Sequence, residues 1–382
     1  MAIAARWFCQ SAKRLVRPRR RWHSPTMKPG PETIDAFLRQ AQGNARAIFR
    51  VAALLRTHGD DIRATDLCCD LLAQGDLDPG LATEIRRFLS VGVPDWHLVI
   101  LRDSPRSAAY DAALRTLVRP GMRVLEIGTG SGILAMMAAR AGAAEVITCE
   151  RNPSIAAAAR EVIARNGFAD RIRVVNVQSD ALDLDRDLGG QRADLLMSEI
   201  ISNNLLSEHV LPAHEDAVRR LVKPGAPVIP ARGTVRIALV DDQREQSQPL
   251  GEIAGFDLSP YNRLAPVVRT ARPNAAGITL RSEAIDLFDF DFSGRRYEAS
   301  ERVMNLPSLG GRVTGVIQWL RLDMDGQGGI YENRPGPRSV SSWSAMVTAF
   351  PEPVETAAGE PVRVRGTHDC RNTELYRACP RN

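Results

Sequence analysis

The segment Val124–Leu134, with the sequence VLEIGTGSGIL, limits the possible folds of this 382-residue chain more than any other stretch. An apolar run typical of a buried strand, Val124–Ile127, leads into a glycine-rich turn and then into a helical pattern over Ile133–Arg140. The turn contains Gly128, Gly130 and Gly132. Residues without a side chain let the backbone turn tightly and approach a ligand at the carboxyl end of a strand. The segment therefore predicts a strand–turn–helix unit with a ligand site at the turn.

Strand and helix patterns alternate in the same way over residues 91–230. Further strands are predicted at Val146–Cys149, Ile172–Val177 and Asp194–Met197, and further helices at Ile155–Arg165 and Glu208–Val222. Alternating strands and helices form parallel sheets that helices cover on both faces. This region is expected to be a Rossmann-like, doubly wound α/β domain.

Residues 231–382 show a different pattern, in which short β-type runs are separated by Gly, Pro and Asn turns. The runs lie at Thr234–Val240, Ile278–Phe290, Val313–Met324, Ser344–Phe350 and Pro361–Arg365. Such a pattern predicts an antiparallel sheet. The α/β domain is therefore expected to be followed by an antiparallel β-barrel-like domain.

Two further regions precede the α/β domain. Residues 1–31 contain eight Lys or Arg and no acid, and without these eight cations the formal net charge of +5 becomes −3. This basic arm is expected to be disordered, with an organellar presequence or contact with nucleic-acid phosphates as alternatives. Residues 32–90 have apolar side chains at helical spacing and breaks at Gly59 and Gly75. They resemble a degenerate tetratricopeptide hairpin, which serves either as a platform for the catalytic core or as a surface for a partner.

Composition argues against membrane and metal-binding classes. No run of about 18 apolar residues occurs, so a membrane span is not expected. The cysteines form no CxxC pair and have no spacing to histidine that suits zinc, so no metal site is expected. They are Cys9, Cys68, Cys69, Cys149, Cys370 and Cys379. Reduced thiols make a cytoplasmic location the default expectation.

Three acids around the glycine turn favour S-adenosylmethionine as the cofactor. Glu126 stands two residues before Gly128, and the glycine spacing is GxGxG, whereas dinucleotide sites have GxGxxG. Glu150 is expected at the end of the next strand, where a carboxylate can accept both ribose hydroxyls. Asp180 is expected at the end of the strand after that, where it can accept the adenine amino group. The alternative is a structural glycine turn with solvated carboxylates.

Four segments resemble the protein arginine N-methyltransferase family. Ser198–Glu208, SEIISNNLLSE, resembles the family's double-glutamate loop, and Trp96–Tyr110 resembles the helix that closes over its cofactor. Gly255–Ser259 resembles the start of the family's barrel and dimerisation arm, and Ser341–Trp343 stands where the family has Thr-His-Trp. The resemblance covers about residues 90–375 and is strongest to a divergent branch with helical repeats before the catalytic core.

The resemblance implies a role for each matching residue. Glu199 and Glu208 hold the substrate guanidinium, with Asp103 beside them in the catalytic helix. Arg106 meets the methionine carboxylate of the cofactor, His97 lines the adenosine pocket, and Trp343 walls the substrate channel. The resemblance further implies a protein substrate with a Gly/Arg-rich segment and a homodimer formed through residues 255–275.

Chemistry gives an independent reason for two glutamates. Arginine is a planar cation with five donors and a pKa above about 12, so no ordinary base deprotonates it in advance. Two carboxylates can fix the fork by bidentate pairing and hold its positive charge away from one terminal nitrogen. That nitrogen is then positioned to attack the sulfonium methyl group in line.

The chain departs from the family pattern at Ser342, which replaces the histidine that pairs with the aspartate at position 103. A hydroxyl cannot carry the charge of that pair or act as its base, so this chain does not have the family's pair for proton removal. Ile100 and Val210 stand where many relatives have methionines, so the product type stays open. A different methyl acceptor, or a non-catalytic helical-repeat binding protein, remain as alternative functions.

Overall fold

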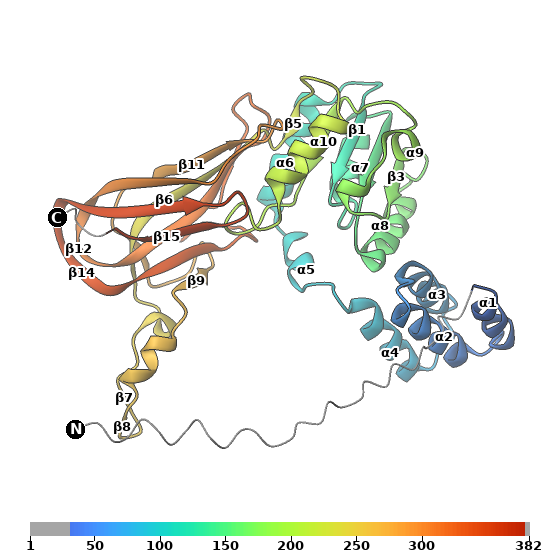
Figure 1. The fold of residues 1–382 in the computed structure, drawn as a ribbon, viewed down its shortest axis with the longest axis horizontal. Helices are drawn as coiled ribbons and strands as arrows, with labels where there is room; N and C mark the ends of the chain where they lie inside the picture. Colours follow the sequence, from blue (N-terminus) through green and yellow to red (C-terminus); the bar gives the residue numbers. More distant parts are fainter. Residues whose placement is uncertain (1–30, 379–382) are drawn as a thin grey trace, which may run out of the picture. The chain divides into compact units, whose positions relative to one another are not determined.

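The computed structural model describes residues 31–378 and divides the chain into two compact units, Met1–Ala82 and Thr83–Asn382 (Figure 1). The first unit is helical, with α1 (Pro31–Gln40), α2 (Ala45–Thr57), α3 (Asp61–Ala73) and the start of α4 (Pro79–Ser90). Side chains of Asn44 and Asp60 cap α2 and α3. The helices expected in residues 32–90 are therefore present. The basic arm and its alternative interpretations lie outside the described residues.

The second unit begins with α5 (Trp96–Ile100) and α6 (Ser104–Leu117) and continues into a five-stranded parallel sheet. Its strands are β1 (Arg123–Ile127), β2 (Glu145–Cys149), β3 (Ile172–Val175), β4 (Leu195–Ser198) and β5 (Val228–Ile229), in the order β3-β2-β1-β4-β5. Helices α7 (Ile133–Ala141), α8 (Pro153–Arg165), α9 (Leu184–Leu188) and α10 (Val210–Arg220) connect or follow them. The predicted α/β domain is thus confirmed, with an additional short strand at β5.

Two predicted element ends are wrong. The third strand stops at Val175, and Asp180 lies beyond it in the 3₁₀ turn η1 (Ser179–Ala181). The backbone leaves the sheet early because Asn176 turns back to bond the carbonyl of Glu150 at 2.6 Å. Helix α10 begins at Val210, so Glu208 belongs to the preceding loop and not to the helix start. Both acids are consequently held by loops.

The C-terminal part is an eight-stranded antiparallel sheet, as expected. Its strands are β6 (Arg232–Asp242), β9 (Val268–Ala271), β10 (Ile278–Leu280), β11 (Ile285–Asp291), β12 (Ser300–Asp323), β13 (Ile330–Glu332), β14 (Ala345–His368) and β15 (Thr373–Arg377). The single strand predicted at Ile278–Phe290 is two strands. The strands predicted at Ser344–Phe350 and Pro361–Arg365 are the two ends of β14, which pairs with β12 along most of its length.

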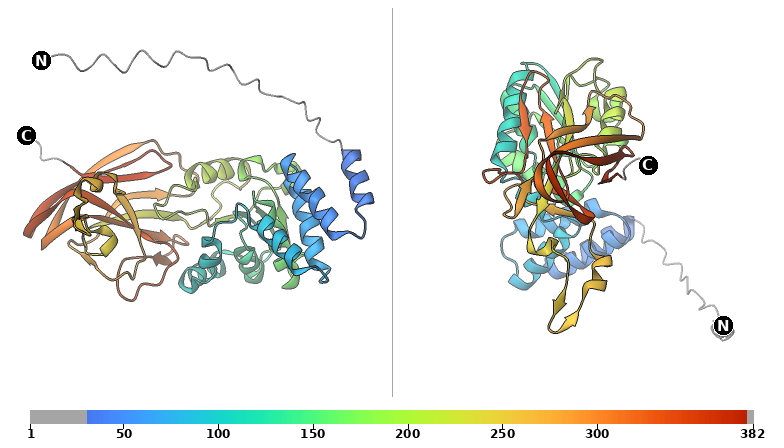
Figure 2. Two further views of the ribbon diagram at one scale, coloured as in Figure 1. Left: turned by 90° about the horizontal axis from the view of Figure 1, so that it is seen from below. Right: turned by 90° about the vertical axis from the view of Figure 1, so that its left-hand side faces the viewer.

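An arm leaves this sheet between β6 and β9 and projects from it (Figures 1 and 2). It contains η2 (Glu245–Ser247), β7 (Glu252–Ile253), β8 (Phe256–Asp257) and η3 (Ser259–Leu264). Large apolar side chains of the arm are exposed, namely Leu250, Ile253, Phe256, Leu258, Tyr261, Leu264 and Val267. The arm thus presents an apolar surface to solvent in the single chain.

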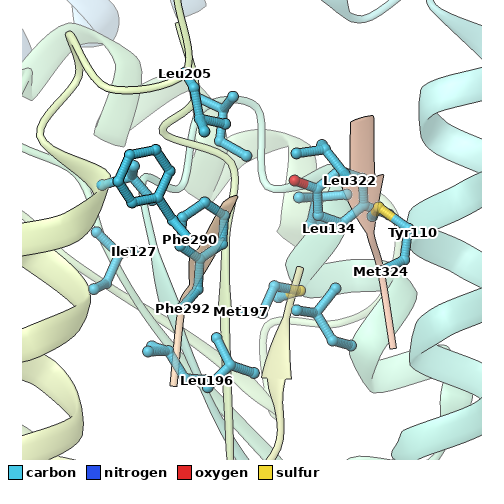
Figure 3. Close-up of a cluster of buried hydrophobic side chains, with 14 of the residues drawn as sticks. Tyr110, Ile127, Leu134, Leu196, Met197, Leu205, Phe290, Phe292, Leu322 and Met324 are labelled. Carbon is cyan, nitrogen blue, oxygen red and sulfur yellow. The ribbon is translucent and has the colours of Figure 1, made fainter. Parts of the chain in front are cut away.

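One hydrophobic core joins the two sheets of the second unit. Figure 3 shows Leu196 and Met197 of the parallel sheet gathered with Phe290 and Leu322 of the antiparallel sheet. At Gly233 on β6 a Cβ atom would stand 2.6 Å from Phe292 Cζ and 2.8 Å from Leu205 Cδ1. There is therefore no room for a side chain at Gly233, where β6 packs against Phe292 and against the loop containing Leu205.

Within residues 31–378, no helix combines the length and apolarity that a bilayer crossing requires. The same residues contain no group of three or more His, Cys, Asp or Glu arranged to hold a metal ion.

Candidate active site

The glycine turn after β1 adopts backbone conformations that side chains rarely allow. Gly128, Gly130 and Gly132 have φ of 85°, 52° and 81°. A Cβ at Gly128 would meet Ile200 Cγ2 at 2.9 Å, whereas a Cβ at Gly130 would have nothing within 4 Å. The turn is therefore open to a ligand at Gly130 and lies against the residue that follows Glu199.

Glu150 holds the glycine turn from the end of β2. Its carboxylate accepts hydrogen bonds from the backbone N–H groups of Gly130 at 3.2 Å and Asn152 at 2.9 Å. His97 is half-buried and stacks on Trp96. Burial lowers the pKa of His97, and the charge of Glu150 opposes that shift. The two residues predicted to bind adenosine therefore act on each other across the turn.

Among the described residues, Asp180 makes no hydrogen bond or ion pair with Glu150, His97 or the glycine turn. Its side chain is exposed, and its Oδ2 accepts a hydrogen bond from Gln178 Nε2 at 3.4 Å. It lies in the 3₁₀ turn η1, beyond the end of β3 and not at a strand end. The sequence prediction of its role as an adenine ligand stays a prediction.

Glu126 lies in the middle of β1 and is completely buried. Neither of its carboxylate oxygens has a hydrogen-bond partner within residues 31–378. Burial raises the pKa of Glu126 to about 8, although the neighbouring Thr148 hydroxyl, which falls outside hydrogen-bond geometry, opposes the shift. Such a group is available to a cationic ligand, whose charge would favour the ionised form.

Replacement of Glu126 by Gln is expected to change the pH dependence of stability. Its folded pKa of about 8 exceeds the ordinary value of 4.5, so the folded state binds the proton more tightly. The stabilisation by Glu126 is present below pH 4.5 and is lost as the pH rises toward 8. Thermal unfolding of the unliganded chain should therefore show Glu126→Gln gaining stability relative to wild type between pH 5 and pH 8. A difference that stays constant over this range would contradict the buried, unpaired carboxylate.

Arg106 and Glu199 form a buried ion pair beside the turn. Arg106 Nη2 lies 2.8 Å from Glu199 Oε2, and the two side chains are 4% and 10% exposed. The remaining Arg106 donors, Nε and Nη1, are buried and have no partner among the described residues. Burial raises the pKa of Glu199 to about 7, although Arg106 opposes the shift. The site thus already binds one guanidinium to Glu199 and retains donors for an anionic ligand.

Glu208 occupies the other end of the loop from Glu199. Its residue is exposed to solvent, yet burial of the carboxylate raises its pKa, with Arg151 opposing the shift. Negative charge on Glu208 in turn raises the pKa of Glu199. Two non-glycine residues of this loop, Leu205 and His209, have φ of 75° and 63°. Such conformations are costly and persist only where surrounding contacts hold them.

Those contacts come from the loop and from the antiparallel sheet. Asn204 Oδ1 accepts hydrogen bonds from Ser202 Oγ and from the backbone N–H groups of Leu206 and Ser207. Trp343 Nε1 donates to the carbonyl of Ile201 at 2.7 Å. Further contacts to the loop come from Ser344 and Asn372. Trp343 is buried and anchors the loop, a role that its sequence interpretation as a channel wall did not include.

Asp103 precedes α6 and is 3% exposed. Its Oδ1 caps the helix by accepting the backbone N–H of Arg106 at 2.9 Å. Its Oδ2 accepts from the backbone N–H and the hydroxyl of Ser342, at 2.6 and 2.9 Å. Ser342 therefore contacts the aspartate that the sequence paired with it.

Two residues near the site, His214 and Tyr331, were missed in the sequence, and Tyr110 was noted there only as part of the segment that resembles the family's helix. The Tyr110 hydroxyl donates to the carbonyl of Ser198 at 2.9 Å, just before Glu199. His214 is buried between the Ser198 hydroxyl at 2.6 Å and the carbonyl of Phe292 at 3.0 Å, and burial lowers its pKa to about 4. Tyr331 lies 3.2 Å from Asp103 Oδ2. The contacts of all three residues join separate elements, so no local pattern predicts them.

The donor and acceptor set fits S-adenosylmethionine. The unpartnered buried N–H groups of Arg106 suit a carboxylate, and the unpartnered carboxylate of Glu126 suits an ammonium or sulfonium charge. Glu150 lies at the open glycine, where it can accept ribose hydroxyls. These groups come from β1, β2 and α6, at the carboxyl end of the parallel sheet, where such folds bind ligands.

Comparisons with known proteins match the chain to methyltransferases. The family model for ribosomal protein L11 methyltransferase (PrmA) matches residues 112–231. The chain is 38% identical over 280 residues to an arginine N(omega)-methyltransferase of Streptomyces achromogenes subsp. streptozoticus, covering 72% of this chain and 76% of that protein. It is 30% identical over 300 residues to protein arginine N-methyltransferase 7 of Danio rerio, covering 71% of this chain but only 44% of that longer protein.

Solved structures show the same fold at low sequence identity. The Trypanosoma brucei PRMT1 enzyme–prozyme heterotetrameric complex with AdoHcy aligns with a TM-score of 0.64 at 22% identity, covering 75% of this chain and 93% of that one. Arabidopsis thaliana protein arginine methyltransferase 10 aligns with a TM-score of 0.56 at 18% identity, covering 70% and 85%.

The Rossmann-like sheet, the open glycine turn and its acids define an S-adenosylmethionine-dependent methyltransferase. Within that class, the antiparallel domain and the identity to the Streptomyces protein point to one family. The chain belongs to the arginine N-methyltransferase family.

Proposed function

We propose that the chain methylates a guanidinium nitrogen of arginine that Glu199 and Glu208 hold. One observation carries this proposal: Glu199 is a buried carboxylate that binds the guanidinium of Arg106 at 2.8 Å on a loop packed against the glycine turn. A substrate guanidinium presents the same fork of donors. We assign Glu208 as the second carboxylate for this guanidinium, because its negative charge raises the pKa of Glu199.

When bound, S-adenosylmethionine supplies an electrophilic methyl group on a sulfonium. The chain's residues orient the acceptor. Glu199 and Glu208 fix the fork and draw its positive charge toward the nitrogens that they contact. The substrate nitrogen gains a methyl group and gives up one proton. Glu208 is the carboxylate of the pair with access to solvent, so it is the group that can pass this proton to water.

The acceptor can be arginine in a protein or free arginine. The protein acceptor, with a Gly/Arg-rich segment, follows from the resemblance and from the relatives named protein arginine N-methyltransferase. Free arginine is the second candidate, because the relative at 38% identity is named only for arginine. Both candidates use the same pair of glutamates.

Transfer from cofactor with a labelled methyl group separates these acceptors. A Gly/Arg-rich peptide, the same peptide with every Arg changed to Lys, and free arginine are incubated with the chain. Label on the Arg peptide alone supports the protein acceptor, and label on free arginine alone supports the second candidate. Label on the Lys peptide would contradict guanidinium methylation.

We further propose that the chain forms a homodimer through its arm. Phe256 and Leu264 are 70% and 65% exposed in the single chain, and a second copy is the partner that the family resemblance implies. Burial of such side chains contributes about 1.5–3 kcal/mol each.

Replacement of Phe256 and Leu264 by Ser is expected to weaken this dimer by at least about a hundredfold in dissociation constant. Sedimentation equilibrium measures the change. Leu309→Ser, which alters an apolar side chain that is 58% exposed outside the arm, is the matched control. A wild-type chain that sediments as a monomer at micromolar concentration would remove the basis of this proposal.

A further inference from the structure

Asp103 Oδ2 accepts more hydrogen bonds than a carboxylate oxygen could keep while it also accepts a proton as a catalytic base. Its Oδ2 accepts from the Ser342 backbone N–H, the Ser342 hydroxyl and the Tyr331 hydroxyl, at 2.6, 2.9 and 3.2 Å. One carboxylate oxygen has about two lone pairs. A proton can reach Oδ2 only if one of these donors leaves, and Oδ1 is engaged by the N-terminus of α6.

The tyrosine is itself held in place from two sides. Tyr331 is 6% exposed, and its hydroxyl lies 2.7 Å from Ser341 Oγ. Its ring packs edge-on against Trp343 with centroids 5.4 Å apart. The Tyr331 hydroxyl is the donor in both contacts, so its single proton is shared between Asp103 Oδ2 and Ser341 Oγ.

Residues 341–344, which we call the clamp segment, touch both halves of the site. Through Ser342 the segment binds Asp103, the cap of the helix that carries Arg106. Through Trp343 and Ser344 it binds the loop that carries Glu199 and Glu208. The clamp segment therefore helps to position Arg106, on the cofactor side of the site, and the loop of Glu199 and Glu208, on the substrate side.

We propose that Tyr331 and Ser342 are positioning residues that lock Asp103 as a fixed link between the two halves of the site, in place of a proton-accepting pair. Tyr331 donates a further hydrogen bond to Asp103 Oδ2 beside those from Ser342. Asp103 then transmits the position of the clamp segment to Arg106 through its helix cap and does not receive the substrate proton. This inference rests on the proposed methylation of arginine only for its activity measurements.

Tyr331→Phe removes one hydroxyl that bonds a buried carboxylate. The expected result is a decrease of about tenfold to a hundredfold in kcat/KM, with weaker binding of S-adenosylhomocysteine in a calorimetric titration. Tyr376→Phe, whose side chain is 41% exposed on β15, is the matched control and should change neither quantity. Ser342→Ala should act in the same direction, and Ser342→Thr, which keeps the hydroxyl, should restore function.

The pH profile of kcat separates positioning from proton transfer. Tyr331→Phe and Ser342→Ala should lower the whole profile without moving its acid limb. A displaced acid limb in either variant would show that Asp103 takes part in proton transfer and would overturn the proposal. So would a Ser342→His variant that is more active than wild type, because it would show that the site has room for a histidine base beside Asp103.

The binding titration keeps this test independent of the acceptor. If no arginine substrate is methylated but Tyr331→Phe weakens cofactor-product binding, the proposed function fails and the positioning network stands. If wild type methylates arginine and Tyr331→Phe matches it in rate and binding, the network is refuted while the function stands.

Discussion

Replacement of Glu199 by Gln is expected to lower kcat/KM for the arginine acceptor by about 10²–10⁴-fold. The variant keeps the size of the side chain and removes the charge that pairs with the substrate guanidinium. Breaking a buried ion pair at one partner costs about 3–5 kcal/mol, and each 1.4 kcal/mol corresponds to tenfold in rate. Steady-state kinetics with labelled cofactor measure the loss.

Glu283→Gln is the matched control for this variant, because Glu283 is exposed on the antiparallel domain. It should leave kcat/KM within about twofold of wild type. In wild type the pKa of about 7 for Glu199 predicts that activity falls as the pH decreases through 7, since the protonated acid no longer pairs with the substrate. If Glu199→Gln and Glu283→Gln had the same kcat/KM, Glu199 would have no role in binding the substrate guanidinium.

Replacement of Arg106 by Leu is expected to destabilise the folded chain by about 3–5 kcal/mol at pH 8. Glu199 is 10% exposed, and loss of its cation leaves an uncompensated buried charge. The pKa of Glu199 then rises further, because Arg106 is the largest influence that lowers it. The loss should therefore be greater at pH 8 than at pH 5.5, where Glu199 is protonated. Urea unfolding at the two pH values measures it.

A second substitution isolates the pair from its surroundings. In the Arg106→Leu background, Glu199→Gln should recover part of the lost stability, because the stranded charge is gone. Cofactor binding should stay weak in both variants, since we expect the buried, unpartnered N–H groups of Arg106 to bind the cofactor carboxylate. Additive losses in the double variant would show that the two side chains are not coupled in solution.

The parallel domain was predictable because its signals are local. Val124–Ile127, the glycines and the following helix lie within one short segment, and β1, β2 and β4 are short and largely buried. The end of β3 was not predictable, because the side chain of Asn176 competes with the sheet for backbone contacts. That difference moved Asp180 into a turn.

The antiparallel domain was predicted in kind but not in detail. β14 contains Pro351, Pro353 and Gly359, which normally mark strand ends. The strand continues because its pairing with β12 shifts register at two points, which accommodates the irregular residues. A pattern of local alternation cannot reveal such compensation by a partner strand.

The candidate site was predictable only where the family resemblance or the strand ends supplied it. The link between Asp103 and Tyr331 joins residues 228 positions apart, and the Trp343 bond to the glutamate loop spans 142. No periodicity or spacing predicts such contacts. The replacement of the family histidine by Ser342 was visible in the sequence. Its effect on Asp103 could be inferred only from the structure, which shows Tyr331 beside the same carboxylate.

The most direct test of the proposed function is to identify the atom that receives the methyl group. The chain is incubated with methyl-labelled S-adenosylmethionine and either a Gly/Arg-rich peptide or free arginine, and the product is analysed by tandem mass spectrometry. The predicted result is label on a terminal guanidinium nitrogen of arginine, reduced at least about a hundredfold in Glu199→Gln. Label on any other side chain, or transfer to arginine at an unchanged rate in that variant, would contradict it.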